Sequence, residues 1–468
     1  MTLAVEPGDR APGPTRGLAR FVCDLRYDAL AEPTRQAARR HVLDTVGACV
    51  AGAREQVANA VAAVFSDAGI GGDVPVPGRG GRVDLLNAAY LAGASAHGLE
   101  LDDGYRNGSV HAGAVVVPAT LAAAYRRGAS GRDLLTAVVA GYEVAARVSA
   151  AGHPRVRWRG FHTTSTSGVF GAAAAVGLLY GLDEERLMNA FGLAASSAAG
   201  LFAFVRGGGD VKRLHPGHAA REGLLAALLA AQGLSGPPDV LEVVDGYFHA
   251  FAGDDPRKAD YRAPDLFADW QGYAIEDCYI KPYACCRHIH PALDAMLEIL
   301  NAQDLAPADV ARVDVATYEV AAAHAAAGWE NMGTAQLSFP FVMAVGLHKR
   351  NVDLHDFSEA RRSDAVITAD CAKFHVTVDP ECDADYPSLR PAKVRLTTIA
   401  GDTFAAQVDD AYGSPLNPMD DDALSEKYRA ITVPVLGREL SDTSLAGLWR
   451  LDDQDRIAPL ADMLARPV

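Results

Sequence analysis

The stretch DLLTAVVAGYEVAARVSAA, residues 133–151, decides the fold class of this chain. Its apolar residues recur three and four positions apart, the spacing that gathers them on one face of an α-helix. Its many alanines suit helices that pack closely. Segments with this pattern run from about residue 18 to residue 233, so we predict a large all-helical domain there. The others are TRQAARRHVLDTVGACVAGA (34–53), LLNAAYLAGASAHGLE (85–100), VVVPATLAAAYRRG (115–128) and AREGLLAALLAAQGL (220–234).

The pattern changes after residue 270. Three segments alternate apolar and polar residues as half-buried strands do, and the last turns back at residues 400–402 like a hairpin. We predict a mainly α fold: a large helical domain (1–272), a smaller α+β lid domain (273–402), and a C-terminal segment (403–468) that returns to the helical domain. The strands are ARVDVATYEV (311–320), KFHVTV (373–378) and AKVRLTTIAGDTFAAQV (392–408), and a helix is expected in TAQLSFPFVMAVGLHK (334–349).

The composition excludes several classes of protein. The 468 residues carry 43 basic and 59 acidic side chains, a net charge of -16, and no long basic run, which argues against nucleic acid as a partner. No apolar stretch is long enough to span a bilayer, and the Pro/Gly-containing N-terminus has no signal-peptide core, so no membrane association is expected. Seven scattered cysteines do not form a disulfide framework. We expect a cytoplasmic enzyme or binding protein.

The stretch LELDDGYRNGSVHAG, residues 99–113, places Glu100, Asp102 and Asp103 shortly before His111. A carboxylate beside a histidine fixes its tautomer and tunes its pKa, as general acid–base catalysis requires. The alternative is an acidic loop in contact with solvent.

Two further stretches carry groups suited to binding an anion. In RGFHTTSTSGVFGAAAAVG (159–177), His162 precedes hydroxyl residues at a helix start, where free N–H groups attract carboxylates. In FVRGGGDVKRLHPGHAAREG (204–223), Arg206, Lys212 and His215 make a local basic patch. The alternatives are an ordinary helix cap and a basic helix start that balances acidic neighbours. Neither stretch is a P-loop or a GxGxxG motif.

The fourth stretch is YIKPYACCRHIHPALDAM (279–296). Adjacent cysteines rarely bind one tetrahedral ion and no second ligand pair follows, so no metal site is expected. A pocket-lining loop with Lys281 facing the substrate is the better interpretation. The remaining histidines, His41, His97 and His324 among them, are predicted to be packing or surface residues. Neither GxSxG nor HExxH occurs, which argues against two common hydrolase classes.

Taken in order, these motifs resemble the MmgE/PrpD family, whose members include dehydratases, decarboxylases and an epimerase of small polycarboxylic acids. The resemblance covers nearly the whole chain. It implies a helical domain built from both chain ends, an α+β lid, a cleft between them, a homodimer, and catalysis without metal or cofactor. The motifs are ARRHVLDTVGACVAGA, AHGLELDDGYRNGSVHAG, GFHTTSTSGVFGAAAA, GGGDVKRLHPGHAA, KPYACCRHIHPALDA and TAQLSFPFVMAVG.

The resemblance also implies roles for individual residues. The chain departs from the family pattern in several places. Glu100 stands where aspartate is expected, the loop from the acids to His111 is one residue longer than in the decarboxylase, and HAG (111–113) stands where HPG is usual. Cys286 stands where a decarboxylase carries a histidine, and Phe341 where many relatives have tyrosine. The expected catalytic residues are Glu100, Asp102, His111, His162 and Lys212, and the expected substrate-binding residues are Asp103, Arg206, His215, Lys281, Cys286 and Phe341.

From these motifs we predict a metal-independent lyase that removes or returns a proton beside a carboxylate of a small anionic substrate. The first candidate is a dehydratase of a 2-methylcitrate-like hydroxy acid. The alternatives are an epimerase or decarboxylase of a small polycarboxylate, a tailoring dehydratase of secondary metabolism, and, from another class, a non-catalytic acid-binding or scaffold protein.

Overall fold

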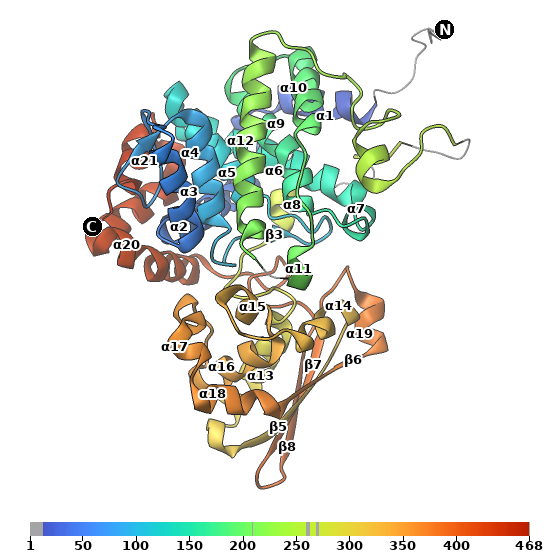
Figure 1. Cartoon of the computed structure of the whole chain (residues 1–468), viewed down its shortest axis with the longest axis vertical. Helices are drawn as coiled ribbons and strands as arrows, with labels where there is room; N and C mark the ends of the chain where they lie inside the picture. Colours follow the sequence, from blue (N-terminus) through green and yellow to red (C-terminus); the bar gives the residue numbers. More distant parts are fainter. Residues whose placement is uncertain (1–12, 208, 259–262, 268–270, 468) are drawn as a thin grey trace.

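The computed structural model describes residues 13–467, except residues 208, 259–262 and 268–270. Two hydrophobic cores divide these residues into a helical unit and a lid unit. The lid unit comprises residues 284–408, and the helical unit is built from the chain on both sides of it. Figure 1 shows the two units meeting end to end, with β3 at the junction. The predicted mainly α fold with a smaller α+β part is confirmed.

The helical unit is a bundle around α6, whose residues are almost all buried. Small side chains permit close approach: a Cβ on Gly141 would lie 2.8 Å from the carbonyl oxygen of Gly171 on α9. α6 is long and apolar enough to cross a membrane, but 89% of its most apolar window is buried inside the protein. The helices are α1 (Pro14–Asp24), α2 (Glu32–Gly52), α3 (Gln56–Asp67), α4 (Leu85–Ala96), α5 (Gly113–Arg127), α6 (Gly131–Gly152), α7 (Arg155–Trp158), α8 (Thr163–Thr166), α9 (Gly168–Leu179), α10 (Glu184–Ser196), α11 (Phe204–Gly207) and α12 (Val211–Ala231).

The C-terminal part of the chain packs on the N-terminal part. α20 (Asp421–Trp449), which is kinked at Gly437, lies against α2, and α21 (Ala458–Leu464) follows it. The approach is tight, because a Cβ on Gly47 would lie 2.9 Å from the ring of Tyr428.

The lid unit holds a four-stranded sheet of order β6-β5-β7-β8, with β5 and β6 parallel and the other pairs antiparallel. All three strand predictions are confirmed, but β8 lies beyond residue 402, where we placed the end of the lid. The β7–β8 ladder keeps β8 in this sheet, so the boundary is corrected to residue 408. The strands are β5 (Val310–Thr317), β6 (Phe374–Val378), β7 (Ala392–Thr398) and β8 (Thr403–Val408).

Of the lid helices, α13 packs on this sheet against β7 and β8. The helix expected over residues 334–349 is two helices, because Pro340 begins a new one after Ser338. They are α13 (His290–Ala302), α14 (Glu319–Ala322), α15 (Met332–Leu337), α16 (Phe339–Lys349), α17 (Glu359–Arg362), α18 (Ala365–Asp370) and α19 (Pro380–Asp385).

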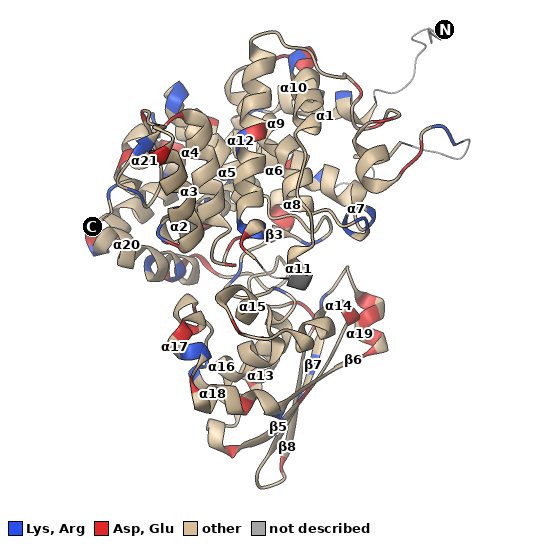
Figure 2. Ribbon diagram, in the orientation of Figure 1, with Lys and Arg blue, Asp and Glu red and all other residues tan. Residues whose placement is uncertain are grey.

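Two short strand pairs complete the fold. β1 (Val74–Pro75) pairs with β2 (Arg82–Val83), and β3 (Gly104–Tyr105) pairs with β4 (Cys278–Tyr279). The second pair holds the acidic motif (residues 99–103), which directly precedes β3, beside the segment that leads from β4 into the lid unit. Acidic and basic residues gather at this junction, near β3 and the start of α12 (Figure 2).

Candidate active site

The acidic motif is held by both hydrophobic cores. Leu99 and Leu101 are buried in the core of the lid unit, although their neighbours in sequence belong to the helical unit. Glu100, which lies between the two leucines, and Asp102, which follows them, point to the other side, where they contact Lys212 and Lys281. Glu100 has φ = 57°, a left-handed conformation that costs a non-glycine residue about 1–2 kcal/mol and often marks functional sites.

Glu100 is the anionic centre of a buried charge cluster. Lys212 on α12 donates to its Oε1, and Lys281 Nζ lies 3.4 Å from its Oε2. Burial works to raise the pKa of Glu100, but the two lysines outweigh it and hold that pKa well below its usual range. Burial likewise works to lower the pKa of Lys281, and Glu100 and Asp102 outweigh it and raise the pKa. The cluster is therefore charged at neutral pH.

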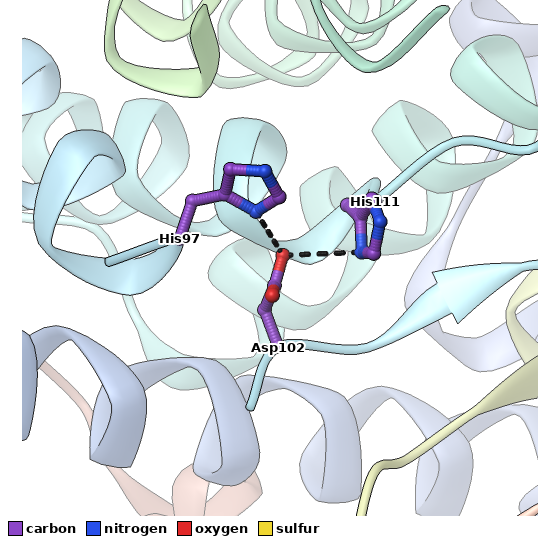
Figure 3. Close-up of side chains that lie close together, drawn as sticks. All are labelled: His97, Asp102 and His111. Carbon is purple, nitrogen blue, oxygen red and sulfur yellow. Dashed lines mark hydrogen bonds and ion pairs between the residues drawn. The ribbon is translucent and has the colours of Figure 1, made fainter. Parts of the chain in front are cut away.

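Asp102 joins two histidines to this cluster (Figure 3). Its Oδ2 lies 2.6 Å from Nδ1 of His97 and 3.2 Å from Nδ1 of His111, and its Oδ1 is 3.8 Å from Lys281 Nζ. Burial lowers the pKa of His97 to about 4, so this ring is neutral at pH 7 and donates its Nδ1–H to Asp102. His111 Nδ1 also contacts the backbone oxygen of Asp103 at 2.6 Å, which leaves Nε2 as the nitrogen that can face a substrate.

The same three side chains are the candidate metal ligands in the described part of the chain, with their ligand atoms within 4.8 Å of one another. Both histidines, however, direct Nδ1 at the carboxylate itself, and the ammonium of Lys281 lies on its other oxygen. A divalent ion would have to displace these contacts. The geometry fits an aspartate that orients histidines better than it fits a metal site.

His162 and His215 form a second histidine pair. Their Nδ1 atoms lie 3.0 Å apart, and the ring of His162 is 6.0 Å from that of His97. Burial, helped by neighbouring positive groups, lowers the pKa of His162 well below its usual range and that of His215 to about 4. Both rings are therefore neutral, with one Nδ1–H donating to the other ring. Phe202 and Phe204 pack against His162.

Cys286 and His324 contribute from the lid unit. Sγ lies 3.7 Å from His324 Nε2, and the ring of His288 stacks on that of His324. Burial opposes ionisation of Cys286, but His324 outweighs it and lowers the thiol pKa, while the thiol raises the pKa of His324. Glu100 acts electrostatically on Cys286, which places this pair at the edge of the charge cluster.

Gln336, at the end of α15, connects these parts. It is fully buried, and its Nε2 donates to the backbone oxygens of Leu99 and Ala284, both at 2.9 Å. Its own backbone oxygen accepts from the N–H of Cys286. One side chain thus holds the acidic motif of the helical unit against the loop of the lid unit.

Most of the predicted site residues converge at this junction. Glu100, Asp102, His111, Lys212 and Lys281 are in direct contact, His162 and His215 lie beside them across His97, and Cys286 faces them from the lid unit. The side chain of Arg206 lies outside the described residues.

Two predicted substrate-binding residues are placed elsewhere. Asp103 is fully buried in the helical unit, where its carboxylate accepts from Gly113 N–H and the Tyr142 hydroxyl and lies 2.7 Å from Nδ1 of His41. Phe341 lies in the core of the lid unit, because its position on α16 directs it toward Trp329. In this structure both side chains are held by contacts within their own units, and their roles in substrate binding stay predictions.

Three residues of the site were not predicted: His97, His324 and Gln336. For His97 the signal was present, since it ends α4 only three residues before Glu100. Gln336 stands in the motif TAQLSFPFVMAVG, and His324 lies outside the motifs; both reach the site through the packing of the lid unit.

Comparison with known proteins gives consistent matches over the chain. A model of the MmgE/PrpD N-terminal domain matches residues 16–260, and one of the MmgE/PrpD C-terminal domain matches residues 283–451. A cis-aconitate decarboxylase of Aspergillus terreus is 28% identical over 100% of this chain and 99% of its own length. Human cis-aconitate decarboxylase is 25% identical over 97% of this chain and 95% of its own length. The cis-aconitate decarboxylase-like protein oryM of Aspergillus oryzae is 30% identical over 60% of each chain.

Proposed function

The chain belongs to the MmgE/PrpD family, and from this premise we propose that it is a lyase acting on a small polycarboxylic acid. The observation that carries the proposal is the buried contact of Asp102 with two histidines beside two lysines. Such lysines bind a carboxylate and stabilise the negative charge that develops on the adjacent carbon in an enolate-like transition state.

His111 is the proposed proton carrier. Asp102 orients its ring and stabilises the imidazolium form, and Nε2 remains available to the substrate. His97 is the proposed positioning residue, because it holds the other side of the Asp102 oxygen. The neutral pair His162–His215 forms the opposite wall of the reaction centre.

Decarboxylation of a cis-aconitate-like acid is the first candidate for the reaction. It is favoured by the similarity of this chain to cis-aconitate decarboxylases over 97–100% of its length. In this reaction the electrons of the broken C–C bond pass to the carbon beside a second carboxylate, and a histidine returns a proton to that carbon as carbon dioxide leaves.

Dehydration of a 2-methylcitrate-like hydroxy acid is the second candidate. It needs an acid that protonates the departing hydroxyl group in addition to a base. The Cys286–His324 pair is the candidate for this acid, since His324 Nε2 lies 3.7 Å from the Cys286 sulfur and the pKa of His324 is raised beside it.

Proton NMR in D2O tests the proposal on the purified, EDTA-treated protein, mixed in turn with cis-aconitate, citrate, 2-methylcitrate stereoisomers and iminodisuccinate. Loss of a carboxylate identifies the decarboxylase, and new vinyl signals from a hydroxy acid identify the dehydratase. Deuterium exchange without elimination identifies an epimerase. No reaction with any of these acids would contradict the proposal and favour a bulkier substrate or an acid-binding protein without turnover.

Activity that survives EDTA treatment is expected, because Lys212 and Lys281 supply the positive charge in this centre. The proposal also includes a homodimer in the cytoplasm. Light scattering after gel filtration tests the dimer, and a mass of 49.2 kDa would contradict it.

A further inference from the structure

Arg390, two residues before β7, is a buried arginine without a counter-ion. Its side chain is 8% exposed, and among the described residues it forms no ion pair or side-chain hydrogen bond; its Nε atom is buried without a partner. The guanidinium lies over the ring of Tyr279, 5.8 Å from the ring centroid. A buried charge without an opposite charge is strongly unfavourable, so this position calls for an anion.

A small cavity at the junction of the two units is lined by the arginines Arg390, Arg106 and Arg287, by Tyr279, and by the carboxylates of Asp277 and Asp410. The arginine that acts on Asp277 is Arg106. Arg106 is paired with Asp410 at 3.2 Å. The terminal nitrogens of Arg287 donate to backbone oxygens and to Ser414. Among the described residues that line the cavity, Arg390 is therefore the arginine whose side chain has neither an ion pair nor a hydrogen bond. The free volume of about 10 Å³ accommodates a group the size of one oxygen atom.

The cavity is close to the reaction centre. Tyr279, the last residue of β4, and Lys281 are two residues apart in the chain. Lys281 contacts Glu100 and Asp102, while the guanidinium of Arg390 lies over the ring of Tyr279. Lys281 and the ring beneath Arg390 thus stand two positions apart on one chain segment, which places both cations at the junction of the two units.

We propose that Arg390 binds a second carboxylate of the substrate, with one carboxylate oxygen entering the junction cavity. This inference rests on the proposed function and adds a position for each of two substrate carboxylates, one at the lysines and one at Arg390. Loss of the guanidinium removes a charge-assisted contact and weakens binding of such an acid about thirty-fold or more.

Calorimetric titration with propane-1,2,3-tricarboxylate, a saturated acid with nothing to eliminate, tests the proposal without turnover. The proteins are the wild type, Arg390→Gln, Arg390→Lys and the control Arg395→Gln, whose arginine is exposed on β7. We expect the stated loss with Arg390→Gln, a smaller loss with Arg390→Lys, and wild-type affinity with Arg395→Gln. Equal affinity of Arg390→Gln and wild type would overturn the proposal.

The melting temperature separates a binding role from a structural one. Removing an unpaired buried charge leaves it unchanged or raises it, so a marked fall in both Arg390 variants would make Arg390 structural and overturn the proposal. If NMR detects turnover and Arg390→Gln keeps the wild-type KM, only this proposal fails. If the wild type neither binds nor converts any polycarboxylate, the proposed function fails with it.

Discussion

His111 and His41 direct Nδ1 at adjacent carboxylates and yet have different surroundings. His111 lies 3.2 Å from Asp102 and is 17% exposed at the side chain, whereas His41 lies 2.7 Å from Asp103 and is buried in the helical unit. Only the first ring can present a nitrogen to a substrate. Asn in place of either histidine keeps a donor near the position of Nδ1 and removes Nε2.

We therefore expect His111→Asn to lower kcat by about 10²–10⁴, the usual contribution of a general acid–base group. His41→Asn is the matched control and should keep kcat within a few-fold while it lowers stability. Steady-state kinetics on the substrate identified by NMR, with melting curves of both variants, measures this. A large loss of kcat in His41→Asn alone would contradict the assignment.

The buried neutral histidines make stability depend on pH. The pKa values of His97 and His215 are about 4 in the folded protein and near 6.5 in the unfolded chain, so the unfolded chain takes up protons first as the pH falls. The contribution of each histidine to the free energy of unfolding is complete above pH 6.5 and is lost toward pH 4. At pH 5 about 2 kcal/mol of it has been lost for each histidine.

Urea unfolding at pH 7 and pH 5 measures this loss. The loss should be smaller in His215→Asn than in the wild type. The exposed His355 serves as the control, and His355→Asn should behave as the wild type does. A free energy of unfolding that is independent of pH over this range would contradict the prediction.

At the level of elements, periodicity in the sequence was sufficient for most of the fold. The helices around α6 and the strands β5 to β8 follow directly from the 3.6- and 2-residue patterns. The charged members of the site were also predictable, because Glu100, Asp102, Lys212 and Lys281 stand in the motifs that carry the chemistry. Sequence alone could not place Asp103 or Phe341, since the direction of a buried side chain depends on partners such as Tyr142 and Trp329.

Gln336 illustrates a residue that only tertiary structure can identify. Gln336→Met keeps the shape of the side chain but leaves the backbone oxygens of Leu99 and Ala284 without their donor. We expect a loss of about 1–3 kcal/mol in the free energy of unfolding. Amide exchange should also become faster around residues 99–103.

The exposed Gln407 on β8 is the control, and Gln407→Met should leave both quantities unchanged. Unchanged exchange around residues 99–103 in Gln336→Met would show that this side chain does not hold the acidic motif.

At the scale of the whole molecule, one contact joins the C-terminal part of the chain to the site. Lys427 on α20 lies 2.5 Å from Asp44 and donates to the backbone oxygen of Leu101 at 3.0 Å. The fully buried Asp44 has a raised pKa because of its burial, and Lys427 acts to lower it. The two ends of the chain and the acidic motif therefore depend on one another.

Lys427→Met would leave Asp44 buried without its cation, which costs about 3–5 kcal/mol of stability. Lys373→Met, which breaks the more exposed pair with Asp370, should cost at most about 1 kcal/mol. Chemical unfolding of the two variants measures the difference. Equal losses would mean that the contact between α20 and α2 does not depend on this ion pair.

The burial of Leu99 and Leu101 in the lid core has a consequence for recombination between relatives. A chimaera that exchanges only residues 284–408 would bring a foreign surface against these two leucines and displace the carboxylates that alternate with them. The transferable block is therefore discontinuous: it must include residues 99–101 together with the lid, although almost two hundred residues separate the two pieces.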